Sequence, residues 1–367
     1  MDESQRKAKA YWRYKNILSL LGLVVLLSYL FIIQFSVSAS LKAFSLSLSG
    51  NFYVSFFIYL IILNLGYYLV SLPLDFYGSF ILEHKFSLSN QNARDWFKDE
   101  MKKWLISIFL SLLLVEIFYA AARNFHDFWW VIASFIWLTF SILFAKIFPI
   151  FVIPLFYKSK PLESNELRDK VLGLAKRFGI KIMDAFEINF SRTTKKANAA
   201  LVGWGDTKRI IMADNLIKEF TVDEIEVVLA HEMAHYKLNH IWKLISAGSV
   251  FTVLLFFILS RIVGPAASAF SADGPFDMAI FPAIYLIIVI YGFVTMPIQN
   301  AISRKLETDA DIMALKITGL KDAFTSLMKK LASKNLSDEN PNILIEILLY
   351  DHPPIAKRIA LAEKLIS

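Results

Sequence analysis

The pattern with the clearest chemical content is His231-Glu232-Met233-Ala234-His235. Two histidines four residues apart share one face of a helix, so both imidazoles can bind a single metal ion. Glu232 follows the first histidine, and its carboxylate can reach a water on that ion. The apolar lead-in Val227–Ala230 favours a packed helix over a surface helix with two unrelated histidines. We therefore expect metal-assisted hydrolysis, with Glu232 as the general base.

The remaining ligands must be found elsewhere in the chain. No cysteine is present, so a metal ion has only His and carboxylate side chains to bind. A catalytic zinc ion takes three protein ligands and keeps one position open, and Glu307 is our candidate for the third. Asp311 lies four residues later on the same helical face and could bond the outer ring nitrogen of a ligand histidine. The alternative is an ordinary charged helix start at Ser303–Asp311. We expect one Zn²⁺ per chain.

Several elements must position this site. Thr221, with Glu224 three residues on, forms a capping-box pattern for a helix expected to run through Asn239 and into the apolar segment that follows. Leu162–Phe178 reads as an amphipathic helix that Gly179 ends. Three short runs predict a small antiparallel sheet with a turn at Gly203–Asp206. These runs are Ala185–Phe190, Asn198–Val202 and Arg209–Met212. Asn198–Leu201 is either an edge strand that pairs with extended peptide or an ordinary core strand.

The composition is that of a membrane protein. The chain has 367 residues, of which 56% are hydrophobic, 15% aromatic and only 19% charged. Its mean hydropathy is +0.50. These values exclude a disordered chain, a fibrous repeat and a plain soluble enzyme. Six segments are long and apolar enough to span a bilayer. They are Ile17–Phe35, Phe52–Leu72, Trp104–Ala122, Phe128–Ile153, Leu244–Val263 and Met278–Ile302. We expect the first to be retained rather than cleaved as a signal peptide.

The distribution of Lys and Arg predicts the orientation. Basic residues gather before the first span, after the second, between the fourth and fifth, and in the C-terminal tail. With six spans, all of these segments lie on one side, which the positive-inside rule assigns to the cytoplasm. The expected parts are a membrane domain at 1–153, a cytoplasmic catalytic part at 154–243, two spans at 244–302 and the rest of the catalytic domain at 303–367. The net charge of +7 then reflects loops that face anionic lipid, and no nucleic-acid partner is expected.

Taken together, these motifs resemble the CAAX prenyl endopeptidases, integral-membrane zinc metalloproteases that process farnesylated proteins. The resemblance covers the chain from about residue 70 to its end. It rests on the segments Leu72–Gly78, Glu83–Phe86, Trp96–Lys102, Pro154–Phe156, Pro161–Glu163, Asn198–Ala199, Lys208–Ile210, His231–His240, Ser303–Asp311, and Asp351–Pro354 with Arg358. The family has seven spans where we count six, and Ala200 stands where the family carries an aromatic residue.

The resemblance implies a mostly α-helical fold: membrane helices that enclose a chamber, capped by a cytoplasmic α+β zinc-protease domain of the gluzincin type. It implies His231, His235 and Glu307 as zinc ligands. His352 becomes the candidate oxyanion donor, with Arg358, Asp311 and His240 as supporting residues. Asn198 and Ala199 become candidate substrate-binding residues.

The resemblance also bears on location and substrate. The absence of eukaryotic insertions suggests a bacterial inner-membrane protein, and the implied partners are the lipid bilayer and a membrane-associated or lipidated polypeptide. Two other functions stay open, a quality-control protease for membrane proteins and a non-catalytic transporter or scaffold. The intact Glu232 argues against the scaffold, which needs no general base.

Overall fold

The computed structural model describes residues 3–203 and 208–365. The first half is almost entirely helical. Its helices are α1 (Glu3–Ile32), α2 (Ser38–Leu48), α3 (Phe52–Phe76), α4 (Leu82–Lys85), α5 (Ala93–Asn124), α6 (Trp129–Ile147) and α7 (Ile153–Phe156). Single π turns at Ile33–Val37, Tyr77–Ile81 and Phe148–Val152 join α1 to α2, α3 to α4 and α6 to α7.

The second half combines a small sheet with helices. The strands are β1 (Ser159–Pro161), β2 (Asp184–Ile188), β3 (Ala199–Val202) and β4 (Arg209–Ala213). The helices are α8 (Asn165–Phe178), α9 (Asp214–Glu219), α10 (Val222–Lys237), α11 (His240–Ala269), α12 (Phe281–Thr318), α13 (Lys321–Asn335), α14 (Ile343–Leu349) and α15 (Ile355–Leu365), with short 3₁₀ turns at Phe190–Arg192 and Met278–Ile280.

Six helical stretches of the described chain are long and apolar enough to cross a membrane. Each coincides with one of the six expected segments, so the mostly α-helical membrane fold is confirmed. The helices extend well beyond the apolar segments, because polar residues continue the helix once it has left the hydrocarbon. The clearest example is α12, which is continuous from Phe281 to Thr318.

An apolar cavity of about 570 Å³ lies among the membrane helices. Residues of α3, α5, α6, α11 and α12 line it, and most of them are aliphatic or aromatic. Asn64 is one of the few polar residues in this lining, and its side chain accepts a hydrogen bond from Trp104 Nε1 at 3.0 Å. The cavity corresponds to the chamber expected between the spans.

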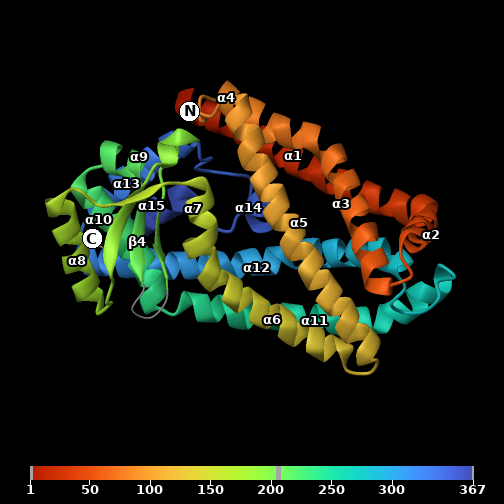
Figure 1. The fold of residues 1–367 in the computed structure, drawn as a ribbon. Helices are drawn as coiled ribbons and strands as arrows, with labels where there is room; N and C mark the ends of the chain where they lie inside the picture. The colour runs from red at the N-terminus through yellow and green to blue at the C-terminus, as the bar shows by residue number, and fades with distance from the viewer. Residues whose placement is uncertain (1–2, 204–207, 366–367) are drawn as a thin grey trace.

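The sheet and its helices gather at one end of the molecule, and the long helices run away from them (Figure 1). The buried core of this part joins α8, β4, α10, α13 and the last turns of α12. Gly179 ends α8 in the left-handed conformation, as predicted. The predicted capping box is also present: Thr221 Oγ1 accepts from the Glu224 amide at 3.3 Å, and Glu224 Oε2 accepts from the Thr221 amide at 2.8 Å.

The sheet is mixed, so the prediction of an antiparallel sheet was wrong. Its strand order is β1-β2-β4-β3, and β2 pairs with β4 in parallel. Side-chain alternation reveals a strand but carries no information on the direction of its partner. The exposed strand β1 was not predicted, because its Ser-Lys-Pro sequence has no strand pattern. The expected turn at Gly203–Asp206 lies largely outside the described residues.

The expected continuous helix from Thr221 into the fifth span is broken. Helix α10 ends at Lys237, and α11 begins at His240. Asn239 between them has φ 56°, in the left-handed region that Asn tolerates better than most residues. The metal-binding pattern therefore lies on a helix of its own, separated from the membrane helix that follows.

Candidate metal centre

Helix α10 presents both histidines of the motif to the same point. His231 Nε2 and His235 Nε2 are 3.0 Å apart, as expected for residues one turn apart on a helix. Their side chains are 13% and 24% exposed. The site is therefore sheltered from bulk water but open on the side of His235.

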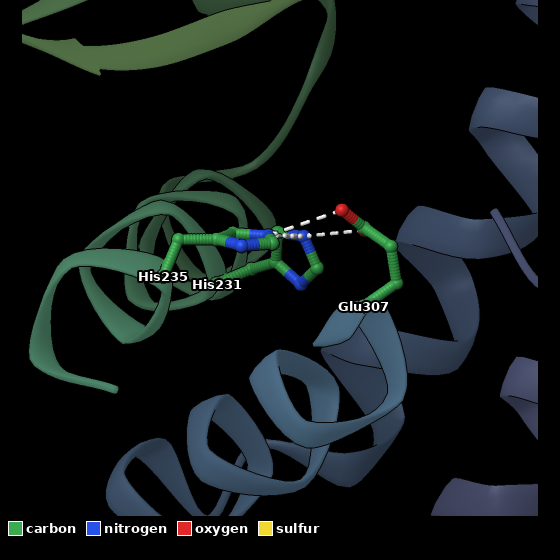
Figure 2. A group of neighbouring side chains, drawn as sticks. All are labelled: His231, His235 and Glu307. Carbon is green, nitrogen blue, oxygen red and sulfur yellow. Dashed lines mark hydrogen bonds and ion pairs between the residues drawn. The ribbon is translucent and has the colours of Figure 1, made fainter. Parts of the chain in front are cut away.

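Glu307 approaches from α12, which crosses beside α10 (Figure 2). Its Oε2 lies 3.2 Å from His231 Nε2, and its Oε1 lies 3.3 Å from His235 Nε2. The side chain is only 10% exposed. The structure thus brings together the three residues expected as ligands, although Glu307 is more than 70 positions from the histidines in the sequence.

The arrangement of these three side chains is better suited to binding a metal ion than to hydrogen bonding among themselves. Their nearest donor atoms all lie within 4.8 Å of each other. Buried Glu307 Oε2 accepts no hydrogen bond from the described residues. Metal bonds of about 2.0–2.1 Å at tetrahedral angles would separate such atoms by about 3.3 Å, close to the distances observed. Two imidazoles and a carboxylate are a donor set that divalent transition metals accept.

Asp311 and Arg358 hold His231 from behind. Asp311 Oδ1 lies 2.9 Å from His231 Nδ1, and the Asp311 side chain is completely buried. Arg358, from α15, donates from Nε to Oδ2 at 2.7 Å and from Nη2 to Oδ1 at 2.6 Å. This carboxylate–histidine pair is the arrangement that fixes the ring orientation of metal-binding histidines.

His240 contacts the other histidine. Its Nδ1 lies 3.0 Å from His235 Nδ1, and the residue is 1% exposed. One ring must donate and the other accept, so His240 orients His235 as Asp311 orients His231. The first residue of membrane helix α11 thus contacts a residue of the candidate metal centre.

His352 lies at the mouth of the site. Its Nε2 is 3.5 Å from Glu307 Oε2, and its side chain is 54% exposed. Asp351 holds the ring through a 2.8 Å contact to Nδ1. Arg304 fixes the segment before it, because its Nη1 donates to the carbonyls of Glu346 and Tyr350 at 2.9 and 2.5 Å. Neither Asp351 nor Arg304 was given a role from the sequence, although both stand in motifs that carried the resemblance.

The electrostatics of the site favour a bound cation. Burial alone would lower the pKa of His231, but the carboxylates of Asp311 and Glu307 beside its ring outweigh burial and raise the pKa to about 9. Burial lowers the pKa of His235 to about 4, which keeps that ring neutral. Burial also raises the pKa of Glu232. A carboxyl group with a raised pKa is suited to taking up a proton near neutral pH.

Strand β3 forms an edge of the sheet and packs against α10. This decides between the two readings of Asn198–Leu201: it is an edge strand. Ala199 begins the strand, and its partner on β4 is Met212. Asn198 precedes it, with its carbonyl bonded to the Ala213 amide at 2.9 Å. Among residues 3–203 and 208–365, no further strand pairs with the outer edge of β3.

Two family profiles match the chain, and together they cover nearly all of it. Residues 161–366 match peptidase family M48. Residues 1–158 match the CAAX prenyl protease N-terminal family, described as five membrane helices.

Individual relatives agree with these profiles. The uncharacterized metalloprotease YhfN of Bacillus subtilis is 30% identical over 310 residues, which cover 83% of this chain and 72% of the relative. CAAX prenyl protease 1 of Saccharomyces cerevisiae is 31% identical over 311 residues, covering 79% and 68%. The crystal structure of S. mikatae Ste24p superposes with a TM-score of 0.88 at 27% identity, covering 99% of this chain and 90% of that one.

Proposed function

Because this chain belongs to peptidase family M48 and is an integral-membrane metalloendopeptidase, we propose that it cleaves peptide bonds in membrane-associated or lipidated polypeptides. The family membership confirms the resemblance seen in the sequence. The observation that carries the proposal is the convergence of His231, His235 and Glu307 beside an edge strand, at the end of a bundle of membrane helices.

We propose zinc as the metal, because two imidazoles and one carboxylate on an HExxH helix are the donor set of zinc peptidases. His231, His235 and Glu307 would hold the ion. When bound, it supplies Lewis acidity that polarises a carbonyl group and lowers the pKa of water. The residues of the chain supply everything else that hydrolysis requires.

The proton steps fall to Glu232. Its carboxylate takes the proton of the attacking water and returns it to the leaving amine. His352 donates a hydrogen bond from Nε2 to the oxyanion that develops on the attacked carbonyl, with its ring oriented by Asp351. Asp311 and Arg358 keep His231 in position throughout.

The substrate binds as an extra strand in this proposal. An extended peptide adds to the free edge of β3 next to Asn198 and Ala199, so its backbone bonds supply affinity. The apolar cavity of the membrane helices suits the lipid group or apolar side chains of such a polypeptide. The names of relatives such as CAAX prenyl protease 1 support a prenylated peptide as the first substrate to test.

We also propose that the protease domain faces the cytoplasm of a bacterium. The basic start of α1 lies against that domain, where Gln5 Nε2 donates to Glu339 Oε1 at 2.8 Å. The segment between the second and third spans, which carries Lys85 and Arg94 on either side of its loop, lies there as well, since the Asn90 amide in this loop donates to the Thr193 carbonyl at 3.1 Å. Both segments belong on the cytoplasmic side by the positive-inside rule. The Bacillus relative supports a bacterial membrane.

The test is peptide hydrolysis by the purified protein in lipid nanodiscs, loaded with zinc. A farnesylated CAAX peptide is compared with its unprenylated twin, with Glu232→Gln as the control that keeps all three ligands. Cleavage of the prenylated peptide alone, lost in the control and after chelation, is the expected result. Cleavage of both peptides would indicate a general membrane-associated endopeptidase, as quality control requires. A zinc-loaded protein that cleaves neither, nor any unfolded membrane protein, would refute the proposal.

A further inference from the structure

A buried polar cluster around Glu83 lies where the membrane helices meet the protease domain. Glu83, in α4, is 9% exposed. From α1, the Tyr11 hydroxyl donates to Glu83 Oε1 at 2.5 Å, and Lys15 Nζ reaches the same oxygen at 3.3 Å. From the protease domain, Lys196 Nζ lies 3.0 Å from Glu83 Oε2 and 3.1 Å from the Tyr11 hydroxyl. One carboxylate thus joins three distant parts of the chain.

The cluster depends on its central charge. A carboxylate removed from water is stable only when paired and hydrogen-bonded. Here Lys15 and Lys196 supply the countercharge, and the side chain of Glu83 itself is 12% exposed. The buried Tyr11 hydroxyl accepts from Lys196 and donates to Glu83, so both interactions would be disturbed without the carboxylate. Glu83 therefore holds the end of the Lys196 side chain in place.

Lys196 stands three residues before the edge strand β3. The residues between are held in place: the Ala197 amide donates to Asn335 Oδ1 at 3.3 Å, and the Asn198 carbonyl accepts from the Ala213 amide at 2.9 Å. The Lys196 carbonyl also accepts from Asn215 Nδ2 at 3.1 Å. Only two residues, Ala197 and Asn198, separate Lys196 from β3, and both are hydrogen-bonded, so we expect a shift of Lys196 to disturb the start of β3.

The loop before α5 makes a second contact with the same segment. Leu88 accepts hydrogen bonds at its carbonyl from the Lys195 amide at 2.9 Å and from Thr194 Oγ1 at 3.0 Å. Ser89 forms an antiparallel bridge with Thr194. The segment that leads into β3 is thus hydrogen-bonded to the membrane part of the molecule, and Glu83 lies in α4, just before that loop.

We propose that Glu83 is a positioning residue for peptide binding: by holding Lys196, it sets the place of β3 beside α10. This inference rests on the proposed function, in which the substrate pairs with β3. Glu83 contacts none of the candidate metal ligands, so its effect falls on substrate binding and not on the metal. The membrane helices thereby contribute to the strength with which the protease domain holds a peptide.

Glu83→Gln in the full chain tests this, because it keeps the side-chain size and removes the charge. With a quenched fluorescent peptide in nanodiscs, we expect KM to rise about tenfold, while kcat and metal content stay within about twofold. Lys196→Met should raise KM by a similar factor. The double variant should be no worse than the more affected single variant, since both remove one interaction. Unchanged KM in Glu83→Gln, or effects that multiply in the double variant, would overturn the inference.

Asp277→Asn is the matched control. Asp277 is also a carboxylate buried among the membrane helices and paired with a lysine, Lys42, but it lies before α12 and away from β3. Its loss should leave KM unchanged. An equal rise in KM would mean that any loosening of the membrane part has the same effect, and the specific role of Glu83 would be refuted.

Hydrogen–deuterium exchange gives a readout that needs no substrate. In Glu83→Gln, the amides of 197–202 should exchange at least several-fold faster, and those of β2 at the unaltered rate. An equal increase in exchange rate in both segments, or no change in either segment, would overturn the inference. If the wild-type protein cleaves no peptide, the proposed function fails, and this measurement still decides the role of Glu83.

Discussion

Replacing Asp311 with asparagine separates two roles of the charge network behind His231. Asp311 is completely buried, and both of its oxygens accept from the Arg358 guanidinium, whose side chain is 13% exposed. A neutral amide would remove the carboxylate to which this guanidinium is hydrogen-bonded. It would also give His231 Nδ1 a weaker acceptor at the position now occupied by a carboxylate oxygen 2.9 Å away.

The loss of the ion pair with Arg358 and the loss of the carboxylate partner of His231 each have a known typical magnitude. Removing one partner of a buried ion pair costs about 3–5 kcal/mol of unfolding free energy. Removing the outer hydrogen-bond partner of a metal-binding histidine weakens metal affinity by about 10–100-fold. That factor corresponds to about 1.4–2.7 kcal/mol. We expect Asp311→Asn to show both effects.

The double variant Asp311→Leu with Arg358→Met distinguishes them. Replacing both members of a buried ion pair with apolar residues is often neutral for stability, so most of the lost unfolding free energy should return. Metal affinity should be at least as weak as in Asp311→Asn, about 10–100-fold below the wild type, because leucine offers His231 Nδ1 no acceptor. The thermal midpoint of the metal-free protein measures stability, and competition with a chromogenic chelator measures metal affinity.

Metal-free samples are needed for the stability measurement, since bound metal would itself stabilise the folded state. A double variant that recovers both stability and metal affinity would refute the reasoning, because Asp311 would then serve only to neutralise Arg358. Full metal affinity in Asp311→Asn would refute it as well.

Three further predictions follow from the site and its supports. His352→Gln should lower kcat by about 10²–10³-fold with unchanged metal content, as loss of an oxyanion donor does. Steady-state kinetics and metal analysis measure both quantities, and an unchanged kcat would contradict the role given to His352. Hydrogen bonds from Lys330 and Ser326 outweigh burial and lower the pKa of Glu224, so its stabilisation is complete above about pH 4.5 and is lost as the pH falls below that value. Thermal midpoints of wild type and Glu224→Gln should therefore converge toward pH 3. His240→Asn should keep metal affinity within about threefold of the wild type, whereas His240→Leu should weaken it about tenfold, because only Asn offers His235 a polar partner. Equal metal affinities of the two variants would contradict the role given to His240.

Local regularities explain what could be predicted from the sequence. Hydropathy marks the spans because a bilayer has one thickness. The spacing of His231 and His235 follows from the helical repeat, and so does the shared face of Glu307 and Asp311. Thr221 and Gly179 act on neighbouring residues only, so their effects on helix ends could be read directly from the chain.

What was missed depends on contacts between distant residues. The parallel pairing of β2 with β4 depends on how the strands assemble into the sheet, and the residue pattern of a single strand does not indicate the direction of its neighbour. The break at Asn239 needs a single residue in the left-handed region, which the helical pattern on both sides conceals. Tyr11 and Lys196 meet at Glu83 although 185 positions separate them. Each is an ordinary residue in its own segment.

Helix α12 runs without a break from its membrane-spanning part to Glu307 in the candidate metal centre. From Phe281, where α12 begins, Glu307 lies about 39 Å further along the axis of the same helix. The histidines lie on α10, which is not continuous with membrane helix α11 because Asn239 takes the left-handed conformation between the two helices. Their contact with α11 is through His240, which lies against His235. A thicker or thinner bilayer changes the tilt of a spanning helix. The turns of α12 that follow Glu307 are packed into the same buried core as α10. A tilt of α12 in the bilayer would therefore strain the packing that holds Glu307 beside the two histidines.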